Sequence, residues 1–365
     1  MNAPHITRWN PEFDFWKFVA AVFILLVHSK HVFGTSLVCR EGYVAVEFFF
    51  VVSGFFMARN VFMDTRPFRL DEIADETTSY LIRKIKAVFI PYCVGFVGCF
   101  AILCLNGIKR GIVGKGLVFD FLMLDEVGLA DGSIVAPGWY LSVLFTTAFV
   151  LYPFMRWNNR FFCGWIAPVL SVFALGALFR RFGGVCNAYG TPFGLFSAAW
   201  VRGFGEVCLG IFAFSASEKI DRNRTVEKSA SNSALRIAAS LLPVLSFSWI
   251  ASARADPETV LLFIAAFAAL SGAGQSYSRI FPVRPCRFVG RLSLWLYLTH
   301  WAVMKALVSA RARIHRVSSL FSARDAASIA ITLAIYLFLC FALAIACMVA
   351  VDVWNRRRGT NARRI

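Results

Sequence analysis

The chain has 365 residues, of which 58% are hydrophobic and only 16% are charged, and its mean hydropathy is +0.65. This composition excludes a water-soluble globule, because a chain of this size cannot cover so much apolar surface, and it makes membrane lipid the expected solvent. The net charge of +17 does not indicate a nucleic-acid partner, since the basic residues form short runs between apolar segments, where they set membrane topology.

Apolar segments long enough to cross a bilayer recur along the whole chain. One helical span needs about 20 such residues. We therefore predict an all-α, polytopic membrane bundle of about ten transmembrane helices, forming a single domain over residues 1–365 with a core at 13–352 and a basic tail at 353–365. The expected spans are 13–33, 42–62, 87–105, 138–155, 161–180, 195–215, 234–251, 258–273, 288–308 and 327–352.

Lysine and arginine are distributed unevenly between alternate loops. With the N-terminus inside, most of them fall on the cytoplasmic side, which predicts an integral plasma membrane protein with both termini in the cytoplasm. The loop from Arg311 to Arg324 opposes this rule, and an interfacial helix there would resolve the conflict. Cys39 and Cys186 fall in expected outside loops, and the sequence leaves open whether they form a disulfide.

The first span carries two ionisable residues, Lys17 and His28. They lie on one helix face at different depths, about 16.5 Å apart along the axis and just over three turns. Such groups are costly in a membrane and usually face a protein interior, so they are site candidates. Lys17 is placed to meet a charged ligand near the cytoplasmic surface, and His28 to remove a proton from a hydroxyl. The structural alternatives are a snorkelling lysine and a buried, hydrogen-bonded histidine.

Two neighbours bear on this pair. Asp14, one turn before Lys17, can pair with it and fix its orientation under either interpretation. His31, one turn beyond His28, could share a metal ion with it, but no further ligands stand nearby and the cysteines show no metal-binding spacing. We therefore expect no metal.

Five segments, taken in order, resemble the acyltransferase 3 family of integral membrane enzymes, which move acyl groups, mostly acetyl, onto extracytoplasmic sugars and related acceptors. The segments are similar to that family's first-helix pattern of a basic residue and a histidine, its second-helix motif, the basic opening of its third helix, its WYL element and its late Ser…Tyr-Leu…His pattern. They are Asp14–Lys17 with His28, Gly42–Phe55, Arg83–Lys86 with Pro91-Tyr92, Trp139-Tyr140-Leu141 and Ser293–His300. The chain departs from the family pattern at Lys17, where arginine is commoner. A lysine ammonium is a point charge and cannot bind a phosphate through two parallel hydrogen bonds as a planar guanidinium does.

The resemblance implies a cytoplasmic acyl-CoA donor, expected to be acetyl-CoA, and a carbohydrate acceptor that enters from outside. It makes His28 the general base between them and Lys17 an electrostatic partner of the donor. Arg83, Lys84 and Lys86, expected at a helix start, would bind the CoA phosphates through their charge and through free backbone N–H groups. Positive-inside anchoring is the alternative for these three.

Residues of the acceptor side are expected near the outer ends of the spans. Glu47, Trp139 and Tyr140 either line the acceptor site or lie at the membrane interface, where aromatic rings gather. His300 is either a second base or a hydrogen-bonded core residue.

The remaining polar groups have structural alternatives. Ser53, next to Gly54, either permits close helix packing or narrows the path of the pantetheine arm. Arg202 and Glu206, at i and i+4, can neutralise each other and are expected to be structural or cavity-lining.

Two other classes of function remain open: a transporter or lipid-linked glycan flippase, and a polysaccharide polymerase or ligase. Either would also use polar groups and an aromatic cavity within a helical bundle, but neither needs an acyl donor. The sequence does not indicate the acceptor, the acyl chain length or the oligomeric state.

Overall fold

The computed structural model describes residues 10–33, 39–107, 115–126, 133–184, 191–224, 231–252, 256–274, 281–314 and 326–357. Its elements are α1 (Pro11–His28), α2 (Lys30–Phe33), η2 (Gly42–Ala45), α3 (Val46–Met63), α4 (Ile73–Leu105), α5 (Lys115–Phe121), η3 (Ala136–Gly138), α6 (Trp139–Trp157), α7 (Asn159–Phe161), η4 (Phe162–Ile166), α8 (Ala167–Phe182), β1 (Pro192–Phe193), β2 (Phe196–Ser197), α9 (Ala198–Arg224), α10 (Ser231–Ala251), α11 (Pro257–Gly272), α12 (Val283–Arg313) and α14 (Ala326–Arg357).

The fold class is confirmed as an all-α membrane bundle. Within the described ranges the only strands are the antiparallel pair β1 and β2, and eight helical segments are long and apolar enough to cross a membrane. The two other expected spans coincide with α11, which has 16 residues, and α12, which has 31. Large apolar side chains such as Phe173 and Phe338 are exposed on the outside of the bundle, as a surface that faces lipid requires.

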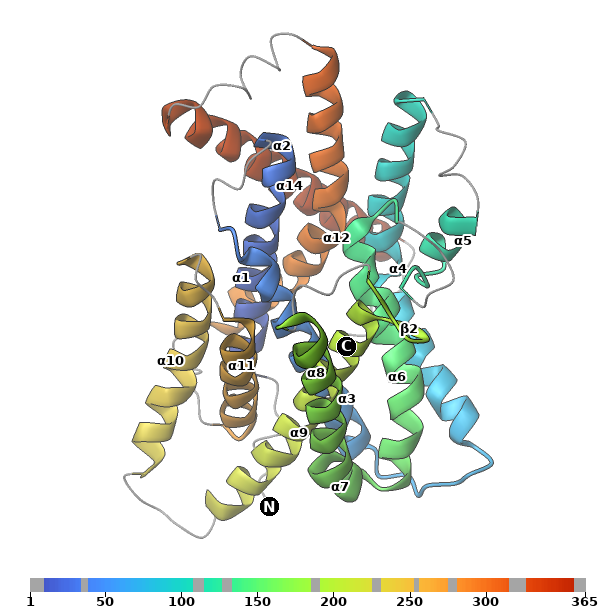
Figure 1. Cartoon of the computed structure of the whole chain (residues 1–365), viewed down its shortest axis with the longest axis vertical. Helices are drawn as coiled ribbons and strands as arrows, with labels where there is room; N and C mark the ends of the chain where they lie inside the picture. The colour runs from blue at the N-terminus through green and yellow to red at the C-terminus, as the bar shows by residue number, and fades with distance from the viewer. Residues whose placement is uncertain are drawn as a thin grey trace.

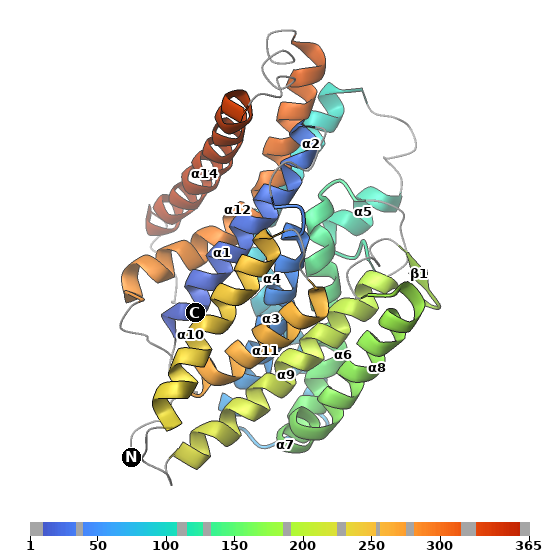
Figure 2. The ribbon, with the colours of Figure 1, turned by 60° about the vertical axis from the view of Figure 1, so that its left-hand side comes forward.

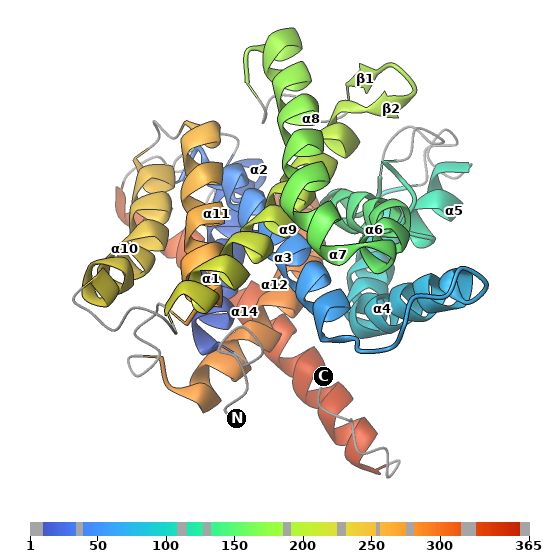
Figure 3. The same cartoon turned by 90° about the horizontal axis from the view of Figure 1, so that it is seen from below.

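The bundle is elongated, and its helices run between two ends (Figure 1). We call the end where α1 begins the near end, and the end where α1 and α2 finish the far end. Helices from opposite ends of the sequence lie side by side: α1 packs along α12, and α14 covers α12 from outside (Figure 2). Viewed along the bundle, α3 and α9 occupy the middle of the molecule (Figure 3). Residues of α1 and α12 can therefore form one site.

Glycines let the central helices approach closely. A Cβ on Gly54 of α3 would overlap the backbone of Val207 in α9, and a Cβ on Gly210 of α9 would overlap the backbone of Val51. Gly95 of α4 meets the Leu298 carbonyl of α12 in the same way. Small residues permit such contacts in membranes, where packing replaces the hydrophobic effect between helices.

The start and end of α1 explain where its ionisable residues stand. Asn10 caps the helix by accepting a hydrogen bond from the Glu12 N–H, and Pro11 occupies the first turn, where its missing N–H costs nothing. The helix ends at His28, and the Ser29 hydroxyl then donates to the Leu26 carbonyl. His28 thus occupies the last position of α1, just before the break into α2.

The sequence prediction placed the start of α4 wrongly. The helix begins at Ile73 rather than near residue 87 and runs for 33 residues, with Pro91 inside it. Its first half extends outwards from the bundle (Figure 3). Arg83 to Lys86 therefore lie within the helix, where their backbone N–H groups are engaged in helical hydrogen bonds.

Two connections also differ from expectation. Helix α9 continues to Arg224 and α10 starts at Ser231, so part of the stretch expected to connect the spans 195–215 and 234–251 is helical. Helix α12 continues to Arg313, and Arg311 donates to the Val32 carbonyl of α2 over 2.6 Å. Arg313 donates to the Leu105 carbonyl of α4. These cations lie at helix C-termini, where the helix dipole favours positive charge, and this accounts for arginines at the far end.

Arg316, Arg324 and Cys186 lie outside the described residues. The proposed interfacial helix and the Cys39–Cys186 disulfide therefore stay predictions.

Candidate active site

Two histidines from distant parts of the sequence meet inside the bundle. His28 Nδ1 lies 2.9 Å from His300 Nε2, and the rings are nearly parallel at a centroid distance of 5.1 Å. The other nitrogen of His300, Nδ1, lies 3.0 Å from the Leu296 carbonyl of its own helix. His300 is completely buried. The sequence left His300 as either a second base or a hydrogen-bonded core residue. The structure shows that it is buried and that its ring contacts His28.

These contacts define where the ring protons reside. A carbonyl oxygen can only accept, so His300 Nδ1 carries a proton and donates to Leu296. In a neutral His300 ring, Nε2 then holds a lone pair and accepts the Nδ1–H of His28. The Nε2 of a neutral His28 is left unprotonated, with a lone pair available to accept a proton. This is the state that a general base needs.

Trp301 completes a ring cluster around His28, and the sequence reasoning missed it. Its ring stands edge-on to His28 at 5.0 Å and to His31 at 5.4 Å between centroids. Its indole N–H is buried and has no hydrogen-bond partner within the described part of the chain. Buried donors are normally satisfied, so this one is a candidate for contact with a substrate. The sequence did hold one indication of Trp301 as a site residue, because it directly follows His300, the last residue of the late Ser…His motif.

Lys17 lies at the near end in a basic group. Its ammonium is 3.2 Å from Asp14 Oδ1, which confirms the predicted pairing, and it stands 4.9 Å from the centre of the Phe56 ring. The guanidinium of Arg59 stands 5.8 Å from the same ring. Cations over an aromatic face are attracted by its quadrupole, so Phe56 holds Lys17 and Arg59 close to each other.

Helix α4 adds charge to this group. Lys84 interacts electrostatically with both Lys17 and Arg83, and its ammonium lies 5.6 Å from the Tyr80 ring centre. The predicted donor residues Lys17, Arg83 and Lys84 are therefore brought together. Lys86 is exposed and, two residues after Lys84, points to the opposite side of the helix. The prediction that free backbone N–H groups assist here is wrong, because the helix begins ten residues before Arg83.

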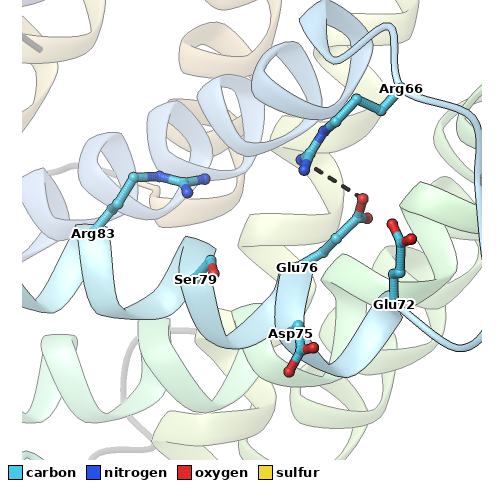
Figure 4. Close-up of a pocket in the computed structure, with 6 residues that line it drawn as sticks. All are labelled: Arg66, Glu72, Asp75, Glu76, Ser79 and Arg83. Atoms are coloured by element: carbon cyan, nitrogen blue, oxygen red, sulfur yellow. Dashed lines mark ion pairs between the residues drawn. The ribbon is translucent and has the colours of Figure 1, made fainter.

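A pocket of about 320 Å³ opens beside this group at the near end (Figure 4), and its lining mixes both charges. The Arg66 and Arg83 guanidinium groups point towards each other across it. Arg66 is already bound, since it lies 2.6 Å from Asp64 and 3.6 Å from Glu76, and its hydrogen bonds hold the pKa of Asp64 at about 2. The lining comprises Arg66, Glu72, Asp75, Glu76, Ser79 and Arg83. With three carboxylates present, this pocket alone is a poor anion site.

Aromatic side chains fill the interior between the near-end cations and the histidines. Ser53 Oγ is 2.8 Å from Tyr140 Oη, the Tyr140 ring lies 5.8 Å from Tyr297, and Tyr297 lies 6.3 Å from His300. The Ser53 hydroxyl is thus engaged with Tyr140, while Gly54 serves packing. An open path for a pantetheine arm beside this row stays a prediction.

The acceptor-side candidates of α3 and α6 are all buried. Glu47 is not at an interface: its carboxylate pairs with Arg202, whose Nε donates to Glu206 over 2.8 Å. The predicted Arg202–Glu206 pair is confirmed. Arg202 also lies 5.6 Å from the Trp139 ring centre, and Trp139 and Tyr140 are too buried to form an exposed aromatic belt. Their contact with a sugar stays a prediction.

A second pocket, of about 480 Å³, lies at the far end between α2, α4 and α12. Sequence reasoning had not assembled it, because its walls come from three separate segments. Its lining comprises His31, Ile102, Leu103, Asn106, Met304, Lys305, Val308, Ser309 and Ala312. Through His31, the pocket adjoins the ring cluster around His28.

Among the described residues, no three His, Cys, Asp or Glu side chains are arranged to hold a metal ion. The expectation that the chemistry needs no metal stays a prediction.

The helices define a polytopic membrane protein, and the buried His300 ring contacts His28 inside its bundle. The sequence model of the acyltransferase 3 family, described as an acyltransferase domain, matches residues 10–353. The chain belongs to this family and is a membrane acyltransferase. Comparisons with curated proteins and with solved structures gave no match.

Proposed function

We propose that this acyltransferase moves an acyl group, in the simplest case acetyl, from cytoplasmic acyl-CoA to a hydroxyl of an extracytoplasmic carbohydrate. The observation that carries the proposal is the His28–His300 contact, which leaves a lone pair on His28 Nε2. The proposed setting is the plasma membrane, with the near end and both termini in the cytoplasm. The basic residues gathered at the near end support this orientation.

In the proposed reaction His28 Nε2 accepts the proton of the acceptor hydroxyl while that oxygen attacks the thioester carbonyl. A carbon–oxygen bond forms and the carbon–sulfur bond breaks. The CoA thiolate then takes the proton from His28, so the ring returns to its starting state. Direct attack by the same nitrogen on the thioester, giving an acyl-histidine, uses the same lone pair. A burst of acylated protein before acceptor is added would favour that two-step route.

The near-end cations support an anionic donor. Lys84 lies within electrostatic range of both Lys17 and Arg83, and Asp14 is the one carboxylate paired with these cations among the described residues. Like charges held together are destabilising unless an anion joins them. The phosphates of CoA carry such charge and would approach from the same side.

The decisive experiment compares glycans from cells that express the wild-type chain and His28→Ala. We expect mass spectrometry to show units of ~42 Da, as for acetyl esters formed by this chemistry, in wild-type samples and their loss in the variant. Purified protein should cleave acetyl-CoA with the same dependence on His28. Ser29→Ala is the matched control, because its hydroxyl contacts the Leu26 carbonyl and its loss should leave transfer intact.

A transporter or flippase would give a different result. Unchanged ester content in His28→Ala cells, with folded protein present in the membrane, would contradict the acyl-transfer proposal. Altered glycan chain length at constant acylation would instead indicate a polymerase or ligase.

A further inference from the structure

The far-end pocket is positively charged. Lys305 projects from α12 into its lining, and the lining contains no aspartate or glutamate. No carboxylate lies within ion-pair distance of the Lys305 ammonium in the described part of the chain. Ala312, also in the lining, stands between Arg311 and Arg313, which add positive potential at the same end.

A buried acid in the same region, Asp120, does not neutralise this cation. Cys99 of α4 interacts electrostatically with both Lys305 and Asp120, so Asp120 faces the same region. Its oxygens are already used: Ser133 donates to Oδ1 over 2.7 Å, and the Ile134 N–H donates to Oδ2 over 2.6 Å. The Lys305 ammonium therefore has no bound counter-charge among these residues.

The pocket also offers groups that suit a sugar. Ser309 donates to Asn106 Oδ1 over 2.8 Å, so the pocket wall already carries a polar pair. The unsatisfied indole N–H of Trp301 lies in the ring cluster that His31 shares with this pocket. A hydroxyl-rich ligand could satisfy that donor while one of its hydroxyls approaches His28.

From these contacts we propose that the far-end pocket binds the acceptor and that Lys305 selects a sugar bearing an anionic group, a carboxylate or a phosphate. The inference rests on the proposed function and deepens it by giving the acceptor a site and a chemical class. Lys305 binds the anion by a charge-assisted hydrogen bond, while Trp301 donates to the sugar and the hydroxyl to be acylated faces His28.

The test uses full-length protein in phosphatidylcholine nanodiscs, which leave both faces accessible. Transfer from acetyl-CoA is measured to methyl glucuronide, glucose 6-phosphate and methyl glucoside, and kcat/KM for each anionic sugar is divided by that for the neutral one. We expect a ratio of about ten or more in the wild type, the size of one charge-assisted hydrogen bond. The ratio should approach one in Lys305→Gln and recover in Lys305→Arg.

Arg291→Gln is the matched control, since it removes an arginine of the same helix, α12, whose guanidinium pairs with Asp352 and does not line the pocket, and it should keep the wild-type ratio. Because each ratio is taken within one variant, partial misfolding cancels. Equal kcat/KM for charged and neutral sugars in the wild type would overturn the inference, as would a ratio that Lys305→Gln leaves unchanged. In both cases acyl transfer itself would stand.

Equilibrium binding of radiolabelled methyl glucuronide, without donor, gives a second arm that does not need turnover. Binding at least about tenfold tighter than that of methyl glucoside, and lost in Lys305→Gln, supports the assignment. If no sugar is acylated and no thioester is cleaved, the proposed function fails, while this binding comparison still decides the pocket's preference. Displacement of the glucuronide by phosphatidylglycerol in the nanodisc would assign Lys305 to a lipid headgroup and overturn the proposal.

Discussion

The Leu296 carbonyl determines which ring nitrogen carries the proton in neutral His300, and through it in neutral His28. Leu296 accepts from His300, His300 accepts from His28, and the basic nitrogen of His28 follows from that chain of two contacts. In the proposed reaction His300 acts only through His28, so we describe it as a positioning residue. The sequence could indicate Asp14–Lys17 and Arg202–Glu206, which are neighbours on one helix. It could not indicate the His28–His300 or Glu47–Arg202 contacts, because these join residues 272 and 155 positions apart.

His300→Leu removes the acceptor for His28 Nδ1–H, so His28 can turn or change tautomer. We expect kcat to fall about 100-fold, in the range of general acid–base effects, with little change in the KM for acetyl-CoA. His300→Gln, which offers an amide oxygen in a similar place, should recover part of the loss. Steady-state kinetics on both variants check this. Equal losses in the two, or an effect confined to KM, would show that His300 serves packing or binding instead.

Hydropathy located the helices well but not their polar extensions. Apolar stretches such as those of α6 and α8 could be predicted because lipid demands about 20 nonpolar residues in a span. The first half of α4 mixes acids, bases and apolar residues. Hydropathy therefore predicts a loop there, although the segment forms a helix. Its fold is fixed by a distant contact: the guanidinium of Arg156 in α6 makes hydrogen bonds of 2.7 and 3.1 Å to the Glu76 carboxylate.

Close contact between α3 and α9 gives a prediction on stability. Gly210→Ala would place a methyl group against the Val51 backbone, which cannot move away without separating the two helices. We expect a loss of about 1–3 kcal/mol in the free energy of unfolding, as for overpacked cores. Gly176→Ala in α8 is the control, because nothing lies within 4 Å of its added Cβ and alanine favours a helix. Denaturant titration in detergent measures both; equal stability of the two variants would contradict the close packing.

On the scale of the whole molecule, the distribution of positive charge and the proposed acyl transfer favour the same orientation in the membrane. The proposed donor cations gather at the near end and the proposed acceptor pocket opens at the far end, so acyl-CoA and carbohydrate meet only if these ends face opposite compartments. Arg311 and Arg313, two of the arginines that oppose positive-inside topology, bind helix carbonyls at the far end. Their charge is therefore partly used within the protein and need not reverse the orientation.

Cysteine labelling tests that orientation directly. In a cysteine-free background, Arg69→Cys places a thiol in the exposed near-end segment before α4, and Ser252→Cys places one in the exposed far-end turn after α10. Both are surface changes and should cost little stability. A membrane-impermeant maleimide added to intact cells should label Ser252→Cys, and it should label Arg69→Cys only after permeabilisation. The reverse pattern would place the near-end cations outside the cell, away from cytoplasmic acyl-CoA, and would remove the proposed donor from the reach of Lys17.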